Sequence, residues 1–227
     1  MSLGGEQDRE KQAAARAAAN MVDSGSIVGL GSGSTATFAI RFLGERVREG
    51  LKIVGIPTSQ KTQQLAEQLG IPLATLDQHP QIDIDIDGAD EIDPQLNLIK
   101  GGGGALLREK IIASASRRFI VVGDASKQVK HLGKFPLPVE VIPFAQSLIS
   151  KRISALGAQV SLRGGAEPFV TDEGHHILDC TFGEILDPAA LANKLKAIPG
   201  VVEHGLFIGM AEMALIGNGA GVIRLHR

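Results

Sequence analysis

The sequence contains no tryptophan and no tyrosine, so its only aromatic side chains, histidine aside, are eight phenylalanines. Proteins that bind single-stranded nucleic acids stack the bases on aromatic side chains, and this scarcity argues against that class of function. The net charge of −2 gives no general attraction to nucleic acids or to anionic membranes. Any anionic ligand must therefore be bound by a local group of residues.

Cysteine occurs once, at Cys180, so no disulfide can form within the chain, which agrees with a reducing compartment. No apolar run approaches the roughly 18 residues that a membrane-spanning helix requires. The first twenty residues mix charged side chains with alanines and are expected to form a helix of the folded protein, not a signal peptide. We therefore expect a cytoplasmic protein without membrane attachment.

Strand-like and helix-like segments alternate along the first half of the chain. Their alternation predicts a mostly parallel sheet covered by helices on both faces. A length of 227 residues with 44% hydrophobic side chains is enough to bury a sizeable core. The strand patterns lie at residues 26–31, 52–56, 82–88, 96–100 and 118–124, and the helix patterns at 6–22, 35–50, 59–70 and 105–116.

The character of the sequence changes near three closely spaced prolines, Pro136, Pro138 and Pro143. Beyond them, two helix patterns are interleaved with strand patterns in the order of a ferredoxin-like module. The C-terminal tail has two apolar runs around Asn218-Gly219 and is expected to return to the first sheet. We predict an α/β fold, with a Rossmann-like three-layer domain of residues 1–132 and 206–227. A smaller ferredoxin-like α+β domain, residues 133–205, is expected to provide a subunit contact.

The stretch DIDIDGADEID, residues 83–93, carries six acidic side chains. A calcium loop would require a carboxylate at its twelfth position, which is Pro94 here. The alternation instead predicts a strand, with Ile82, Ile84 and Ile86 on one face and the aspartates on the other. Because α/β sheets bind ligands at the carboxyl ends of their strands, the turn after this strand is either catalytic or a solvated acidic turn.

The stretch GLGSGST, residues 29–35, joins a predicted strand to a predicted helix. Its N–H groups and the hydroxyls of Ser34 and Thr35 could hold an anion such as a phosphate, and a purely structural turn is the alternative. The dinucleotide-binding pattern would require glycine at position 34. No Gly-Lys-Ser/Thr follows either, as it would in a Walker loop. We therefore predict no nucleotide site.

The stretch KGGGGALLREK, residues 100–110, contains four consecutive glycines. Each ordered glycine costs about 1 kcal/mol relative to alanine, so this run favours a close approach of the backbone to a ligand. Lys100 stands at the end of a predicted strand, and Glu109 lies on the helix that follows. On its own, Glu109 could be either an ordinary solvated helix residue or a functional carboxylate.

Seven segments are spread over nearly the whole chain: GLGSGSTA, DGADEID, KGGGGALLREKIIA, DASKQV, LGKFPLPVEVIP, EILDP and AIPGVVEHGLF. Together they resemble the ribose-5-phosphate isomerase family of the A type. The resemblance implies an enzyme of the non-oxidative pentose phosphate pathway that interconverts D-ribose 5-phosphate and D-ribulose 5-phosphate. It further implies that the enzyme uses no cofactor and no metal, and that it forms a homodimer or a homotetramer.

The resemblance also implies roles for the matching residues. Glu109 would carry a proton between C2 and C1, Asp87 would help to open the furanose ring, and Lys100 would stabilise the enediolate. The substrate-binding positions implied in the same way are Lys11, Ser32, Gly33, Ser34, Thr35, Asp87, Gly88, Ala89, Asp90, Lys100, Gly101, Gly102, Gly103 and Lys127. The family often has threonine at position 32 and alanine at position 104, so Ser32 and Gly104 keep a hydroxyl or a small residue.

The chemistry of this reaction suits a single carboxylate, since one base on one face of a planar enediolate can both remove and return the proton. We expect burial to raise the pKa of Glu109 above the ~4.3 of a free glutamate. A metal-assisted hydride shift would need clustered ligands, and the six histidines show no such spacing. Two other functions stay open: a non-catalytic sugar-phosphate-binding regulatory domain, and a coenzyme A transferase that forms a glutamyl thioester.

Overall fold

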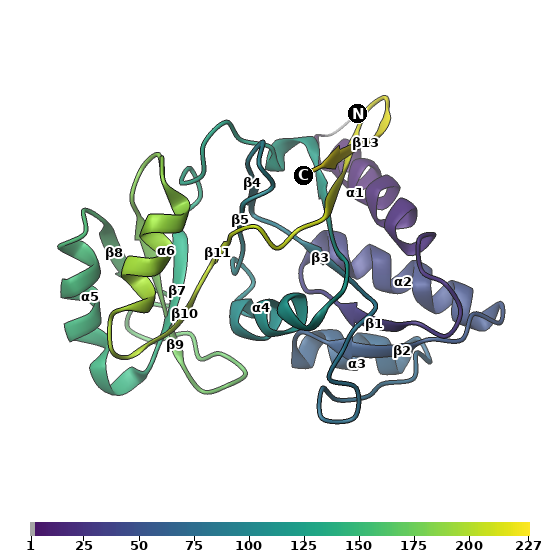
Figure 1. Cartoon of the computed structure of the whole chain (residues 1–227), viewed down its shortest axis with the longest axis horizontal. Helices are drawn as coiled ribbons and strands as arrows, with labels where there is room; N and C mark the ends of the chain where they lie inside the picture. The colour runs from purple at the N-terminus through teal and green to yellow at the C-terminus, as the bar shows by residue number, and fades with distance from the viewer. Residues whose placement is uncertain (1–2) are drawn as a thin grey trace. The chain divides into compact units, whose positions relative to one another are not determined.

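The computed structural model describes residues 3–227, which form two compact units (Figure 1). The first unit comprises the chain up to Ala89 together with Arg108–Lys127 and Met210–Arg227. The second unit comprises Asp90–Leu107 and Gln128–Gly209. Each unit is therefore built from segments that are separated in the sequence.

The first unit contains a six-stranded sheet in the order β13-β12-β6-β3-β1-β2. All neighbouring strands are parallel except β12 and β13, which form an antiparallel hairpin. The expected mostly parallel sheet is confirmed, and the C-terminal tail supplies its last two strands. The strands are β1 (Ile27–Leu30), β2 (Val54–Pro57), β3 (Ile84–Gly88), β6 (Phe119–Asp124), β12 (Met213–Asn218) and β13 (Gly221–His226), and the helices are α1 (Leu3–Ala19), α2 (Ser34–Arg48), α3 (Gln60–Gln68) and α4 (Leu106–Ala115).

The two faces of this sheet are covered by different helices. On one face, buried alanines of α1 and apolar residues of α2 pack with Ile84 and Ile86 of β3. On the other face α4 lies very close to the sheet, because β1 has glycine there. A Cβ at Gly29 would lie 2.6 Å from the Oδ1 of Asp85 and 2.7 Å from the Cγ2 of Ile112. The carboxylates of β3 therefore lie on the face that α4 covers.

The alternation expected for the acidic strand holds from Ile84 onward, but it is wrong for Ile82. Ile82 packs with Ile112 of α4, on the face opposite to that of Ile84. The regular strand begins only at Ile84, since Asp83 forms a bend in which its carboxylate accepts the N–H of Ile27 at 2.8 Å. This bend reverses the face to which the preceding residue points.

The second unit contains a four-stranded antiparallel sheet in the order β10-β7-β9-β8. With its two helices, this order is that of the ferredoxin-like module that the sequence predicts. Residues 172–174 form a turn, so the third strand of this segment begins only at residue 176. The elements are β7 (Leu137–Val141), the 3₁₀ helix η2 (Pro143–Ala145), α5 (Gln146–Ser154), β8 (Gln159–Leu162), β9 (His176–Thr181), α6 (Pro188–Lys196) and β10 (Val201–His204).

A three-stranded sheet in the order β11-β5-β4 completes the second unit. Its strands are β4 (Glu91–Ile92), β5 (Leu98–Ile99) and β11 (Leu206–Phe207). The strand expected at 96–100 is therefore only two residues long, and it pairs antiparallel outside the parallel sheet. This pairing groups residues 90–107 with the second unit. Whether residues 133–205 form an independent domain stays a prediction.

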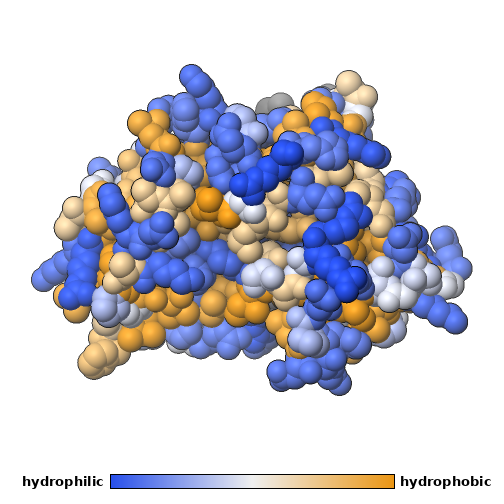
Figure 2. Space-filling view, viewed as in Figure 1, coloured by the Kyte–Doolittle hydropathy of each residue, from blue (hydrophilic) through white to orange (hydrophobic). Residues whose placement is uncertain are grey.

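Polar and apolar residues are interspersed on the face of the molecule that Figure 2 shows. The most exposed large apolar residues are Phe144, at 97% exposure, and Leu186. In the part of the chain that the structure describes, no helix is both long and apolar enough to cross a bilayer. Cys180 is buried on β9, and its burial raises the pKa of the thiol to about 12.

Candidate active site

The turn after β1 is held against the carboxylate of Asp87. The Oδ1 of Asp87 accepts the N–H of Ser32 at 2.9 Å and the N–H of Gly88 at 2.7 Å. Position 31 must be glycine, because a Cβ there would lie 2.5 Å from the Cα of Asp87. Asp87 is fully buried at the end of β3. These contacts bring the predicted turn and the predicted acid together within the first unit.

A cluster of hydroxyl groups supports the same turn, and the sequence analysis missed it. The Oγ of Ser32 lies 2.8 Å from the Oγ1 of Thr58, 2.9 Å from the Oγ of Ser59 and 3.2 Å from the Oγ1 of Thr62. Thr62 also donates to the carbonyl of Gly31 at 3.0 Å. The available signal was the run of hydroxyl residues directly after β2, at the start of α3. These bonds preorganise the Ser32 turn.

Glu109 lies on α4 and is only 4% exposed. It precedes Ile112 by three residues, so the two side chains share one face of the helix. Ile112 packs over Gly29 on the sheet face that carries Asp85. Helices that connect parallel strands run antiparallel to them, so Glu109 lies about one helical turn closer than Ile112 to the carboxyl ends of the strands. The structure thus places Glu109 on the same face and toward the same edge as Asp87.

Two predicted basic residues lie toward the carboxyl ends of the neighbouring strands. Lys127 ends the 3₁₀ helix η1 (Ala125–Lys127) directly after β6, and its stem folds back over Gly123. Lys11 lies on α1, where the backbone of Glu10 touches Gly217 near the end of β12. The ammonium of Lys11 is 3.9 Å from the Oδ1 of Asp8. Among the described residues no hydrogen bond or ion pair joins Lys11 to the Ser32 turn, and the role of Lys11 stays a prediction.

Ala89 is the last residue of its segment in the first unit, whereas the predicted residues Asp90, Lys100 and Gly101–Gly103 belong to the second unit. The N–H of Lys100 donates to the carbonyl of Gly205 at 2.9 Å, and its ammonium lies 5.4 Å from the centre of the Phe207 ring. The N–H of Gly102 donates to the Oδ2 of Asp90 at 2.8 Å. Lys100 is almost fully buried, whereas Gly102 and Gly103 are exposed. A ligand could therefore approach the backbone of these two glycines.

Further contacts hold the glycine run in place. Gly101 and Gly104 have φ angles of 103° and 84°, which favour glycine. A Cβ at Gly104 would lie 2.6 Å from the Cε1 of Phe169. Arg163 also binds the run, and neither Arg163 nor Phe169 was predicted from the sequence, because they lie some sixty residues away along the chain.

The chemistry available in the described residues is that of acids, bases and hydrogen-bond donors. The first unit groups the Ser32–Thr35 turn, Asp87, Gly88 and Glu109, and the second groups Asp90, Lys100 and the glycine run. Residues 3–227 contain no group of three or more histidine, cysteine, aspartate or glutamate side chains that could hold a metal ion.

Comparison with known proteins identifies a consistent set of relatives. The family model for ribose 5-phosphate isomerase A (phosphoriboisomerase A) matches residues 54–221. A ribose-5-phosphate isomerase A of Synechococcus sp. (strain JA-3-3Ab) is 55% identical over 225 residues, which cover 97% of this chain and 98% of that protein.

Solved structures agree with these sequence matches. The ribose 5-phosphate isomerase A of Methanocaldococcus jannaschii superposes with a TM-score of 0.92 at 44% identity, covering 96% of this chain and 98% of that one. A D-ribose-5-phosphate isomerase in complex with phospho-erythronic acid gives a TM-score of 0.95 at 42% identity, covering 97% and 99% of the two chains. The α/β fold expected from the sequence is therefore confirmed.

Proposed function

Because this chain belongs to the ribose 5-phosphate isomerase A family, we propose that it interconverts D-ribose 5-phosphate and D-ribulose 5-phosphate. The observation that carries the proposal is the match at 55% identity over almost the full length of both chains. The reaction moves a carbonyl group between C1 and C2, so it is an aldose–ketose isomerisation. It belongs to the non-oxidative pentose phosphate pathway.

We assign the proton transfer between carbons to Glu109. Its carboxylate would remove the proton from C2 of the open-chain aldose and return it to C1 from the same face of the planar enediolate. The support for this role is a carboxylate that is 4% exposed on the helix face that contacts the sheet. The expectation that burial raises the pKa of this carboxyl stays a prediction.

We assign the transfer of protons between oxygen atoms of the sugar to Asp87. In ring opening it would accept the proton of the C1 hydroxyl as the bond between C1 and the ring oxygen breaks, and it would pass that proton to the departing ring oxygen, which leaves Asp87 ionised again. In the isomerisation it would then move the hydroxyl proton from O2 to O1. Two N–H groups bind the Oδ1 of Asp87 and fix the orientation of the carboxylate. Its second oxygen provides the further lone pairs that these transfers require.

The enediolate carries negative charge on the former carbonyl oxygen, and we assign its stabilisation to Lys100 and the N–H groups of the glycine run. A buried ammonium and fixed backbone dipoles are effective here because they need no reorganisation as the charge develops. Asp90 is assigned to the sugar hydroxyls. The carboxylate of Asp90 accepts the N–H of Gly102, so the residue assigned to the sugar hydroxyls also orients a peptide of the glycine run.

The phosphate is assigned to the turn of Ser34 and Thr35, with Lys127 as a basic partner. The start of α2 offers N–H groups and the positive end of a helix dipole. Phosphate binding takes no part in the bond changes and serves to orient the reacting carbons toward the base. Substitutions in this turn should therefore raise KM more than they lower kcat.

The proposal is tested by assaying the purified protein with D-ribose 5-phosphate in the presence of EDTA, together with Glu109→Gln. We expect turnover in the parent and a loss of about 10²- to 10⁴-fold in kcat for the variant, the usual contribution of a general base. Glu45→Gln, at an exposed glutamate of α2, is the matched control and should keep parental activity.

Each other outcome has a definite meaning. Binding of the sugar phosphate without turnover in the parent would favour the regulatory domain, and a glutamyl thioester trapped by hydroxylamine would favour the coenzyme A transferase. Loss of parental turnover only in EDTA would refute a metal-free mechanism. Full activity in Glu109→Gln would refute the assignment of the base.

We also infer a cytoplasmic enzyme that acts on a small sugar phosphate and associates as a homodimer or homotetramer. The single, buried cysteine supports a reducing compartment. Apolar side chains that are exposed in the second unit, Phe144 above all, support a subunit contact there.

A further inference from the structure

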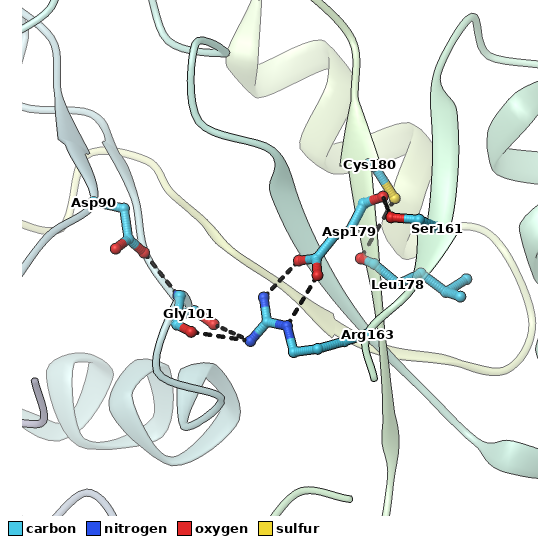
Figure 3. A network of polar contacts seen from close by, with 8 residues as sticks. Asp90, Gly101, Ser161, Arg163, Leu178, Asp179 and Cys180 are labelled. Carbon is cyan, nitrogen blue, oxygen red and sulfur yellow. Dashed lines mark hydrogen bonds and ion pairs between the residues drawn. The ribbon is translucent and has the colours of Figure 1, made fainter. Parts of the chain in front are cut away.

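Arg163 connects the glycine run to the sheet of the second unit (Figure 3). Its Nη1 donates to the carbonyl oxygens of Gly101 at 2.9 Å and Gly102 at 3.2 Å. Its Nε and Nη2 donate to the two carboxylate oxygens of Asp179 at 3.0 and 2.5 Å. Figure 3 shows the guanidinium group of Arg163 between the carboxylate of Asp179 and Gly101. All three nitrogens of the guanidinium group are used.

The strand pairing explains why these two side chains meet. Asp179 lies on β9 opposite Ser161 of β8, and Arg163 follows two residues later on the same face. A bidentate pair fixes the plane of the guanidinium group, which a single ion contact would not do. The side chains of Arg163 and Asp179 are only 17% and 23% exposed, so solvent competes weakly for these bonds.

The hydrogen bonds of Arg163 determine how the glycine peptides are oriented. Within residues 3–227 every peptide bond is trans, so the C=O and N–H of one peptide point in opposite directions. The Gly101–Gly102 peptide is bound at both ends, by Arg163 at its carbonyl and by Asp90 at its N–H. The next peptide has its carbonyl on Arg163, so the N–H of Gly103 points away from Arg163.

We propose that Arg163, held by Asp179, is a positioning residue that aims the N–H of Gly103 at the oxygen on which charge develops. The inference rests on the proposed role of the glycine run in stabilising the enediolate. Arg163 acts in two ways. It fixes the peptide planes, and its charge polarises the carbonyls that it binds, which makes the N–H groups of the same peptides better donors.

The expected effect is smaller than that of deleting a donor outright. Removing one preorganised donor to an oxyanion costs about 10²- to 10³-fold in kcat. Loss of Arg163 leaves the N–H of Gly103 present but misdirected. We therefore expect Arg163→Met to lower kcat by about 10- to 100-fold, with KM changed much less, because the donor acts at the transition state.

Three substitutions separate orientation from charge. Arg163→Met removes every donor and keeps the aliphatic stem. Arg163→Lys keeps the charge but has one ammonium, which cannot hold the carboxylate and both carbonyls together, so kcat should recover only in part. Asp179→Asn removes the carboxylate that holds the guanidinium and should cause a smaller loss. Arg152→Met, at an exposed arginine of α5, is the matched control and should keep parental kcat.

Affinities for two ligands distinguish positioning from a merely structural role. Phospho-erythronic acid carries a planar carboxylate that resembles the enediolate, whereas ribitol 5-phosphate has the phosphate and hydroxyls without such a group. Across the Arg163 and Asp179 variants, the affinity for phospho-erythronic acid should weaken in parallel with kcat/KM, and the affinity for ribitol 5-phosphate should stay constant.

Two results would overturn the proposal. One is a kcat within twofold of the parent in Arg163→Met and Arg163→Lys. The other is an equal loss of affinity for both ligands, which would reveal general damage to the site. Circular dichroism and melting curves accompany each variant. If Arg163→Met fails to fold, Arg163→Lys and Asp179→Asn decide by the same two criteria.

Discussion

Lys100 combines a charge with almost complete burial, since its side chain is 2% exposed. Its ammonium lies 5.4 Å from the centre of the Phe207 ring, and its backbone N–H is bound to Gly205. Burying an ammonium group lowers the stability of the folded state. The same buried charge can stabilise an anion that forms only during the reaction. At the scale of single residues, this lysine and Glu109 are therefore where the proposed mechanism can best be tested.

We expect Lys100→Met to lower kcat by about 10²- to 10³-fold, because the enediolate loses a fixed positive partner. Methionine keeps the length of the apolar stem, so the fold should survive. Steady-state kinetics would measure kcat and KM separately. Lys130→Met, at an exposed lysine of the same unit, is the matched control. A KM effect with unchanged kcat in Lys100→Met would show that Lys100 only binds the substrate.

The sequence points to the groups that we propose to react more readily than to the residues that hold them. Asp87, Lys100 and Glu109 stand at strand ends or helix starts next to glycine-rich turns, and the resemblance to a family assigns their roles. Arg163 and Thr62 could not be found in this way. Their partners lie sixty-two and thirty-one residues away, so the contacts depend on strand pairing and helix packing.

At the scale of elements, the site depends on how closely β1, β3 and α4 approach one another. Two glycines permit this approach, Gly29 of β1 beneath α4 and Gly31, directly after β1, beside Asp87. The sequence shows these glycines, but it does not tell which neighbour requires them. Strands of two residues, such as β4, β5 and β11, are too short to show an alternation of polar and apolar residues, so the sequence does not predict them. The bend at Asp83 places Ile82 on the face opposite to the expected one.

Gly31→Ala should destabilise the protein and reduce its activity, because the new Cβ would lie 2.5 Å from the Cα of Asp87. Overpacking of this kind typically costs about 1–3 kcal/mol, and here the backbone of β3 would have to move. Thermal unfolding and kcat would both be measured. Gly219→Ala is the control, since its Cβ would meet only the Oε1 of Glu6, at 3.6 Å. An unchanged melting temperature in Gly31→Ala would contradict the close approach.

At the scale of the whole molecule, neither unit is a single stretch of chain. The first unit is completed by β12, which pairs with β6 on one side and β13 on the other. A Cβ at Gly217 of β12 would also lie 2.5 Å from the carbonyl carbon of Glu10 in α1, so the strand packs tightly beneath that helix. The four-stranded sheet of the second unit, in contrast, lies within one continuous segment, residues 137–204.

We expect a fragment of residues 128–209 to fold, with a lower stability than the whole chain. The fragment contains all four strands of that sheet and the two helices α5 and α6 that lie between them in the sequence. A fragment of residues 1–127 should not fold cooperatively, since β6 would be left as an unpaired apolar edge. Urea unfolding followed by circular dichroism would compare the two. A sharp transition in the 1–127 fragment would contradict this expectation.

The place of β12 inside the sheet has a consequence for biosynthesis. A ribosome releases β6 early, yet β12, the strand that covers the edge of β6, is made only after residues 128–209. Until residue 218 has emerged, β6 is an edge strand with unpaired backbone groups, which can pair with other polypeptides. We therefore expect the yield of folded enzyme to depend more on chaperones that bind the nascent chain than on the stability of the folded protein.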